Sequence, residues 1–463
     1  METNEARRAD NSAGMLSIAV GIGLLALILA LVGVFLPQST GASGGSGATG
    51  GSSEPKKVDV MLTEFAITPA SIDVEPGQEI IFTVKNHGTM EHDFKVNGTD
   101  GTKLLAVGAT ETVTVAAPAA SVEAWCTTPG HKEAGMVMKI NVTGSTAAAG
   151  PGGSAAPAAT KGAKIDPKAE PPAGWKPYDP ILAPAPGGAT HDVEMHAIEK
   201  LIEVAPGVKQ MMWTFNGTVP GTILRGNIGD LFNITLINDG KIGHSIDFHA
   251  SRVAWNDEMR TIAPGERLLY QFKADYAGAF MYHCGTAPTL HHIGNGMYGA
   301  IVINPPNLSA VDHEYLVVQS ELYLGAQGKE GDLTKMLSEQ WDAVVFNGYY
   351  NQYKFAPIRV EPNQRIRVWV VDDGPSENSA FHIVGTIFDT VWKEGTYLLQ
   401  PDTRQGGSQV LDLQPAQGGF VEFSFAEAGL YPMVTHKFAN ASKGALGLFQ
   451  AGEVTPPAGG ASH

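Results

Sequence analysis

The 463-residue chain has few cysteines and few charges, and each shortage excludes a class of protein. Its two cysteines, Cys126 and Cys284, are too few for a disulfide scaffold. One bridge between them would suit an oxidising compartment, but each cysteine is followed by its own His and Met at a similar spacing, which favours two separate sites. Charged residues make up only 17% of the chain, and the net charge of −16 argues against a nucleic-acid partner.

One long uncharged run lies near the amino terminus. Between Gly14 and Leu36 the residues are mostly Leu, Ile, Val, Gly and Ala, and the run exceeds the roughly 20 residues that a membrane-spanning helix needs. Arg7 and Arg8 precede it, so the amino terminus should stay cytoplasmic while the rest is exported. A cleaved signal peptide is the alternative, but no small-x-small site follows directly. We expect a membrane-anchored, extracytoplasmic protein, either periplasmic or on the outer face of the cytoplasmic membrane.

The 55 glycines and 29 prolines favour turn-rich β structure joined by linkers. Composition predicts a cytoplasmic N-terminus (1–13), a transmembrane anchor (14–36), a flexible linker (37–56), a small β domain (57–143), an Ala/Gly/Pro linker (144–187), two larger-body domains (188–306 and 307–455) and a tail (456–463). A flexible linker of about forty residues would have an end-to-end distance of roughly 35 Å. The small domain could therefore reach much of the larger body's surface.

An internal repeat predicts that the three β domains are of one type. The segment 74–84 (VEPGQEIIFTV) resembles 360–370 (VEPNQRIRVWV), and 226–238 has a similar rhythm. Each is a turn followed by alternating apolar residues, which indicates a half-buried strand, and each is followed by a histidine. These histidines are His92, His244 and His382. We expect an all-β fold of three Greek-key β-sandwiches preceded by one transmembrane helix.

A copper-ligand set occurs in the small domain. Within WCTTPGHKEAGM, a Cys-x4-His-x4-Met pattern places a thiolate, an imidazole and a thioether on one loop, and a distant histidine completes the set. This combination suits a type 1 copper, which cycles between two oxidation states. The predicted ligands are His92, Cys126, His131 and Met136. Residues 57–142 resemble the plastocyanin-like cupredoxins; a degenerate sandwich with a free buried cysteine is the alternative.

A second set of the same kind follows in the larger body: His244, Cys284, His292 and Met297. His291 competes with His292, but only His292 reproduces the His-x4-Met spacing of the small domain. We expect His291 to lie at the rim of this site.

Strand parity predicts a further metal beside the second copper. Neighbouring side chains on a strand point to opposite faces, so His283 is opposite Cys284. In HSIDFH, Asp247 and His249 likewise share the face opposite His244. His249 and His283 can therefore meet, with Asp247 beside them.

The last domain supplies two more histidines, His382 and His436. Three imidazoles with an open position suit a catalytic metal. An Asp and a fourth His that do not bind the metal could then carry protons.

Residues from about 175 to 454 resemble the copper-containing nitrite reductases, through WTFNGTVPG, HSIDFH, YHC and HIGNGMYG. The resemblance implies a dissimilatory enzyme of denitrification, a homotrimer of cupredoxin-type domains that reduces nitrite to nitric oxide. It places type 1 copper on His244, Cys284, His292 and Met297, and type 2 copper on His249, His283 and a neighbouring subunit's His436. It implies catalytic roles for Asp247 and His382, and places Val384 over the substrate pocket.

Each chain would thus hold two type 1 coppers and one type 2 copper. Electrons would come from an extracytoplasmic cupredoxin, a cytochrome c or a quinol-linked donor, and pass from the small domain to the larger body. The sequence departs from most of the family in having an N-terminal copper domain and an anchor, and in the run from Ala250 to Trp255.

Three other readings compete with this one. A two-domain multicopper oxidase reducing oxygen would need a trinuclear cluster, commonly built from His-x-His pairs, and the sequence has none. A non-enzymatic copper electron carrier would not require Asp247 or His382. Zinc at the three-histidine site stays open on ligand type alone.

Overall fold

The computed structural model describes residues 54–63, 66–88, 90–128, 131–132, 136–143, 162–400 and 406–454. The predicted anchor (14–36), the N-terminus before it and the tail (456–463) lie outside these ranges, as does most of the 37–56 linker. Within the described ranges, no helix has both the length and the apolar character needed to cross a bilayer.

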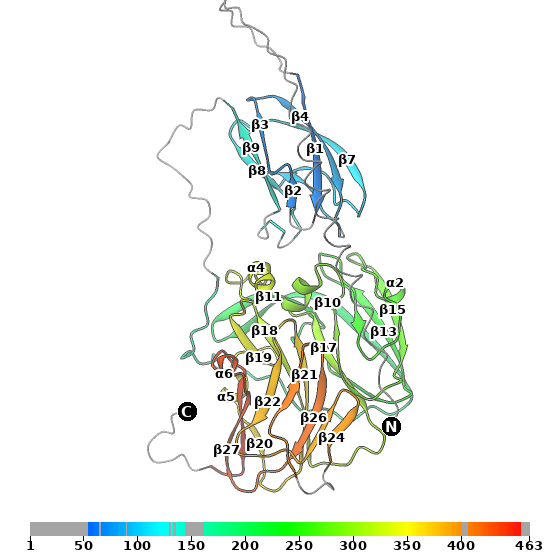
Figure 1. Ribbon diagram of the computed structural model, residues 1–463, viewed down its shortest axis with the longest axis vertical. Helices are drawn as coiled ribbons and strands as arrows, with labels where there is room; N and C mark the ends of the chain where they lie inside the picture. The colour runs from blue at the N-terminus through cyan, green and yellow to red at the C-terminus, as the bar shows by residue number, and fades with distance from the viewer. Residues whose placement is uncertain are drawn as a thin grey trace, which may run out of the picture. The chain divides into compact units, whose positions relative to one another are not determined.

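Residues 56–142, the small domain, form two facing sheets (Figure 1). One has the strand order β2-β1-β4-β7, made of β1 (Lys56–Thr63), β2 (Ala66–Thr68), β4 (Glu79–Asn86) and β7 (Thr110–Ala116). The other has the order β3-β9-β8-β5-β6, made of β3 (Ser71–Val74), β5 (Lys95–Val96), β6 (Asp100–Gly101), β8 (Val122–Trp125) and β9 (Val137–Val142). Alternate residues of β4 (Ile80, Phe82 and Val84) are fully buried, which is the pattern that the sequence predicted.

Residues 190–304 form a second pair of sheets. The order β11-β10-β13-β15 is made of β10 (Thr190–Ala205), β11 (Val208–Phe215), β13 (Leu231–Asn238) and β15 (Arg267–Lys273). The order β12-β17-β16-β14 is made of β12 (Leu224–Asn227), β14 (Asp247–Phe248), β16 (Gly278–His283) and β17 (Tyr298–Asn304). Two short helices, α2 (Trp255–Glu258) and α3 (Thr289–Gly294), lie in the connections.

Residues 313–451 form a third pair. The order β19-β18-β21-β26-β23-β24 is made of β18 (His313–Leu322), β19 (Ala343–Phe346), β21 (Ile366–Gly374), β23 (Thr390–Lys393), β24 (Thr396–Leu399) and β26 (Gly418–Phe423). The order β20-β28-β27-β22-β25 is made of β20 (Ile358–Val360), β22 (Ser379–Ile383), β25 (Leu411–Leu413), β27 (Gly429–Thr435) and β28 (Leu446–Ala451). The helices here are α4 (Leu333–Leu337), α5 (Gln352–Phe355) and α6 (Phe438–Ala441).

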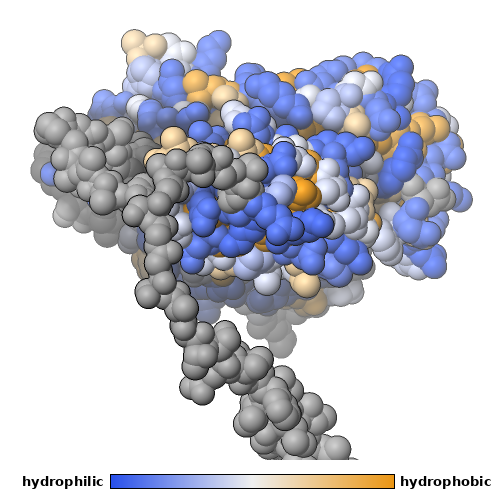
Figure 2. Space-filling view, turned by 90° about the horizontal axis from the view of Figure 1, so that it is seen from above, coloured by the Kyte–Doolittle hydropathy of each residue, from blue (hydrophilic) through white to orange (hydrophobic). Residues whose placement is uncertain are grey.

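One apolar cluster joins the second and third pairs of sheets into a single body, here called the core (residues 162–454). It includes Met281 and Ala300 from one pair and Val318, Trp369 and Phe420 from the other, all nearly inaccessible to solvent. The small domain has its own apolar cluster around Phe82 and Phe94. The all-β class is confirmed, while the count of three domains stays a prediction. The surface visible in Figure 2 is mostly hydrophilic, as the acidic composition leads one to expect.

Part of the predicted 144–187 linker lies packed on the core. We call residues 162–186 the strap. Backbone hydrogen bonds tie it down at both ends, from Ala163 N to Gly325 O (2.7 Å) and from Leu182 N to Glu314 O (3.0 Å). Between them, the Trp175 ring packs on Tyr349 with centroids 4.9 Å apart. The length of chain left between the small domain and the core is therefore shorter than composition alone predicted.

Candidate metal centres

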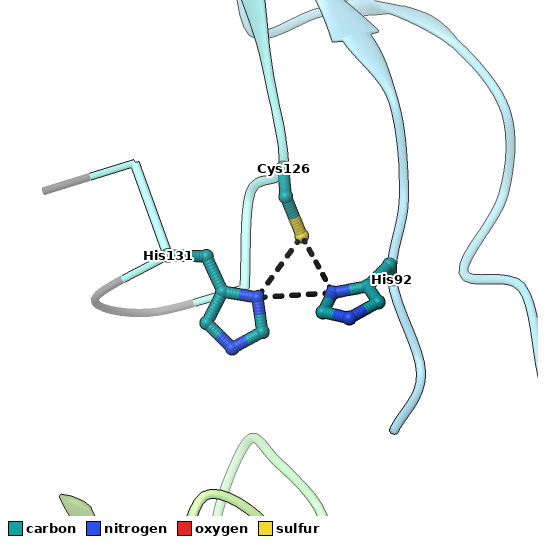
Figure 3. Close-up of side chains that lie close together, drawn as sticks. All are labelled: His92, Cys126 and His131. Atoms are coloured by element: carbon teal, nitrogen blue, oxygen red, sulfur yellow. Dashed lines mark hydrogen bonds between the residues drawn. The ribbon is translucent and has the colours of Figure 1, made fainter. Parts of the chain in front are cut away.

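Three of the four predicted ligands of the small domain, His92, Cys126 and His131, converge on one point (Figure 3). Cys126 Sγ lies 3.4 Å from His131 Nδ1 and 3.8 Å from His92 Nδ1, and the two nitrogens are 3.2 Å apart. All three residues are buried. His92 is held by a two-way backbone bridge to Leu105, Cys126 directly follows β8, and His131 lies on the loop between β8 and β9.

Met136, the fourth predicted ligand, is also fully buried. Its N–H donates to His131 O (2.9 Å), and Cys126 N–H donates to Met136 O (3.3 Å). These bonds close the Cys–His–Met loop into a compact turn. Burial raises the pKa of the Cys126 thiol to about 11, so an apolar pocket alone disfavours the thiolate. A bound cation would reverse that preference, and this donor set fits copper.

The core repeats the arrangement at His244, Cys284 and His292, whose ligand atoms all lie within 4.8 Å of one another. The loop closes through the same bonds, from Cys284 N to Met297 O (3.1 Å) and from Met297 N to His292 O (3.0 Å). His244 is held by a bridge to Ile262, as His92 is by Leu105.

Both ring nitrogens of His244 and Nε2 of His292 are buried without a hydrogen-bond partner. Burial lowers the pKa of His244 to about 3 and that of His292 to about 4, with repulsion from His292 adding to the effect on His244. His292 Nδ1 lies 3.1 Å from Pro288 O, and His244 Nε2 lies 4.0 Å from Glu199 Oε1. Buried polar atoms normally find partners, so the ring nitrogens left without a hydrogen bond beside a thiol suit a soft metal ion.

His292, rather than His291, faces Cys284. His291 is 1% exposed, so the expectation that it lies at the rim is wrong. Its ring packs on Trp213 with centroids 4.7 Å apart, and its Nε2 lies 3.3 Å from Gly331 O. The neighbouring ring of His292 packs on the same indole at 4.8 Å. Trp213 therefore holds both histidines from one side.

Sequence reasoning missed one side chain next to the core thiol. Ser245 N–H donates to Cys284 Sγ (3.4 Å), and Ser245 Oγ lies 3.9 Å from the same sulfur. Its hydroxyl also accepts from Gly285 N–H (3.0 Å). The only available signal was its place directly after a ligand histidine.

A second metal site begins on the opposite face of β16. Asp247 of β14 pairs with His283 of β16, and the Nε2 atoms of His249 and His283 lie 3.1 Å apart. Asp247 Oδ2 is 3.9 Å from His283 Nε2. His283 Nδ1 lies 3.0 Å from the Cys284 carbonyl oxygen, so it can donate there and leave Nε2 free for a metal. Strand parity thus placed the two adjacent residues on different sites.

Electrostatics favours a neutral His249 ring at this site. Burial, followed by the neighbouring His283, lowers the pKa of His249. Neutral imidazoles are the form that binds a metal ion. The site is nevertheless accessible, because His249 is exposed and its two companions are half-buried.

His382 and His436 lie together on another face of the core. His382 is on β22, His436 directly follows β27, and these strands pair, so the two rings lie with centroids 5.5 Å apart. His436 N–H donates to Ala380 O (2.7 Å), and the ring of His382 is held through Nδ1 by Gln409 O. Neither joins the group of Asp247, His249 and His283 within the described chain.

Several exposed apolar residues lie close in sequence to these two histidines. Val384 is 39% exposed, Ile387 67% and Phe438 56%. The Phe438 ring lies 4.7 Å from that of His436. His436 is exposed and His382 is half-buried. Exposed apolar groups beside an accessible histidine are typical of a surface that another chain covers.

Comparisons with known proteins agree on the class of chemistry. The family model described as multicopper oxidase matches residues 197–308. A copper-containing nitrite reductase of Neisseria meningitidis serogroup A / serotype 4A is 36% identical over 267 residues, which cover 55% of this chain and 68% of that protein.

Two solved structures resemble the core. A copper nitrite reductase from Nitrosomonas europaea has a TM-score of 0.53 at 33% identity, covering 57% of this chain and 94% of that one. A multicopper oxidase has a TM-score of 0.51 at 26% identity, covering 57% and 89%.

Proposed function

Since the chain belongs to the copper-containing nitrite reductases, we propose that it reduces nitrite to nitric oxide at a site held by His249, His283 and His436. Copper bound at the three sites would supply one-electron chemistry and, at the histidine site, an open position for nitrite. The overall reaction consumes one electron and two protons per nitrite and releases nitric oxide and water.

The end of β16 supports this proposal: its last residue, His283, and the residue directly after it, Cys284, belong to different sites. Cys284 contributes to the buried site and His283 to the accessible one, although they are adjacent. The peptide link between them is a short covalent route for an electron from the buried site to the accessible one. The small domain, whose ligand set is of the same type, would deliver electrons to Cys284.

Asp247 and His382 supply the proton chemistry in this proposal. Asp247 Oδ2 lies beside His283 Nε2 (3.9 Å), where it can hydrogen-bond to bound nitrite and hand on a proton. His382 is held through Nδ1 by Gln409 O, so its Nε2 is the atom left to move a proton. Val384 is exposed beside it and would shape the pocket.

The accessible site needs a second copy of the chain. His436 is not near His249 or His283 within the described chain, and it sits on an exposed apolar face with Phe438. We infer a homotrimer in which the partner subunit's His436 completes the site. An anchor at 14–36, an extracytoplasmic location and an extracytoplasmic donor are parts of the proposal that rest on sequence alone.

The test is nitric oxide release from nitrite by copper-loaded protein and by two variants. His249→Ala should abolish it, whereas His87→Ala, which changes an exposed histidine outside every site, should not. Oxygen uptake without nitric oxide release in the unmodified protein would favour the multicopper oxidase reading instead. Equal nitric oxide release by both variants would show that His249 is not at the reacting site.

A further inference from the structure

Residues 144–161, here called the tether, connect the small domain to the strap. The strap therefore fixes the point at which the tether joins the core. Its two ends are bonded close to the two ends of β18: Leu316 N–H donates to Pro180 O (2.8 Å) near the start of the strand, and Ala163 N–H donates to Gly325 O (2.7 Å) just beyond its last residue. A ten-residue strand at about 3.3 Å per residue is roughly 30 Å long. The strap therefore carries the chain about 30 Å across the core before the tether begins.

The segment that accepts the hydrogen bond from the strap, from Gly325 to Gly331, also contacts the site of Cys284. Gly331, six residues after Gly325, donates its N–H to Asn295 Oδ1 (2.6 Å), and its carbonyl lies 3.3 Å from His291 Nε2. Helix α4 then packs on α3, the helix that contains His292. Packed helices lie about 8–10 Å apart, so the tether begins about one helix away from a copper ligand.

The start of the strap is in close contact with α4 and the segment before it. A Cβ added to Gly162 would lie 3.1 Å from Leu324 O and 3.2 Å from Lys335 Nζ of α4. Lys335 in turn donates to Leu324 O (2.8 Å) and pairs with Asp342 (2.8 Å). The first described residue of the strap thus lies directly against the helix that supports the His292 loop.

The tether is long enough to reach this site and too short for a distant one. Residues 144–161 number eighteen, and so span at most about 65 Å when extended. In the small domain the chain leaves at Thr143, one six-residue strand from Met136, or about 20 Å from the ligand cluster. Adding roughly 20 Å to cross from one site to the other gives about 40 Å. The equivalent site on a symmetric neighbour lies about one body diameter farther away, roughly 50 Å for a body of about 290 residues, and the total exceeds the reach of the tether.

The small domain and the core each carry exposed apolar residues close to a cysteine site. In the small domain, Leu104 (52% exposed) and Val107 (57%) flank Leu105, the residue bridged to His92. In the core, Leu337 (54%) ends α4 and Leu201 (48%) lies by Gly328. Small apolar surfaces of this kind suit brief electron-transfer encounters, which bury little area.

We propose that the small domain docks on the exposed surface around Leu337 of its own chain, and that electron delivery to the Cys284 site occurs within one chain. This rests on the proposed function, in which the small domain donates to that site. Tethering raises the effective concentration of the donor at this surface, so delivery needs no stable interface.

Shortening the tether tests whether its length lets the small domain reach the Cys284 site. Protein reduced with ascorbate is mixed with nitrite, and the reoxidation of the two cysteine-bound coppers is followed by their absorption, with Cys126→Ser protein used to assign the core's band. Deleting residues 147–156 leaves eight tether residues, which span about 30 Å at most. Reoxidation of the small-domain copper should slow at least tenfold while that of the core copper is unchanged. A Gly/Ser replacement of the same ten residues should restore the rate.

Two further experiments test the docking surface and whether the electron stays within one chain. Leu337→Glu should slow reoxidation of the small-domain copper at least tenfold, whereas Leu398→Glu, at an equally exposed position on β24, should not. In oligomers mixed from Cys126→Ser and Cys284→Ser chains, the small-domain copper should stay reduced, since its own core lacks the acceptor. Reoxidation at the unmodified rate in the mixed oligomers or in the deletion would overturn the proposal. Failure of the core copper to reoxidise in any protein would instead refute the proposed function.

Discussion

Asp247→Asn separates two roles that the carboxylate could play at the accessible site. Asp247 Oδ2 lies 3.9 Å from His283 Nε2, close enough to be a metal ligand and close enough to deliver a proton to a bound substrate. Asparagine preserves the size of the side chain but cannot donate or take up the proton. The substitution therefore tests the proton role and leaves the packing nearly unchanged.

The expected loss of activity is large, and the expected loss of stability is small. General acid–base help is typically worth about 10² to 10⁴ in rate, which is about 2.7 to 5.4 kcal/mol of barrier. The Asp247 side chain is 25% exposed, and substitutions at accessible positions typically change stability by about 0.5 kcal/mol or less. A hundredfold fall in kcat at an almost unchanged Tm is thus expected.

The assay is nitric oxide release at saturating nitrite, together with copper content and the EPR signal of the type 2 copper. The variant should keep its copper and its signal while losing turnover. Full turnover would refute the proton role of Asp247. Loss of the type 2 signal would show that the carboxylate binds the metal.

Three further predictions concern stability, assembly and metal removal. Burial raises the pKa of Asp373 well above its ordinary value, and neither of its oxygens has a hydrogen-bond partner. The folded protein therefore holds a proton that the unfolded chain loses above about pH 4, and stability falls as pH rises, by up to about 1.4 kcal/mol per pH unit. Asp373→Asn should flatten the decline in Tm between pH 5 and pH 8; parallel curves would contradict this. Phe438→Glu should yield monomers in light scattering that keep both cysteine-copper absorptions but make no nitric oxide, while Leu398→Glu stays trimeric; an active Phe438→Glu trimer would exclude the interface. A copper chelator should abolish turnover before it bleaches those absorptions, because His249 is exposed while both thiols are buried; simultaneous loss would contradict the difference in access.

Local rules predicted the parts of the site that depend on spacing along a strand or a tight loop. The alternation of side chains expected along a strand put His283, the last residue of β16, and the following Cys284 on different sites, and the His-x4-Met spacing selected His292. The same rules predicted β4 from its turn and its alternating apolar residues. Each of these follows from geometry that a few consecutive residues determine.

The packing of the strap and the burial of His291 depend on tertiary contacts and could not be predicted from the sequence. The Ala/Gly/Pro composition of the strap predicts an extended chain, but not that Trp175 packs on Tyr349 or that Ala163 bonds to Gly325. His291 resembles a rim residue in sequence, yet Trp213 and Gly331, both distant along the chain, bury it. Such contacts depend on packing between elements, which no local pattern encodes.

The most direct test of the central claim, that two adjacent residues serve two metal sites with different tasks, is the copper content and spectrum of a His283→Ala protein. We expect copper to fall by one ion per chain, the type 2 EPR signal and nitric oxide release to disappear, and both cysteine-copper absorptions to remain. Persistent nitric oxide release, or loss of the Cys284 copper absorption together with the type 2 signal, would contradict it.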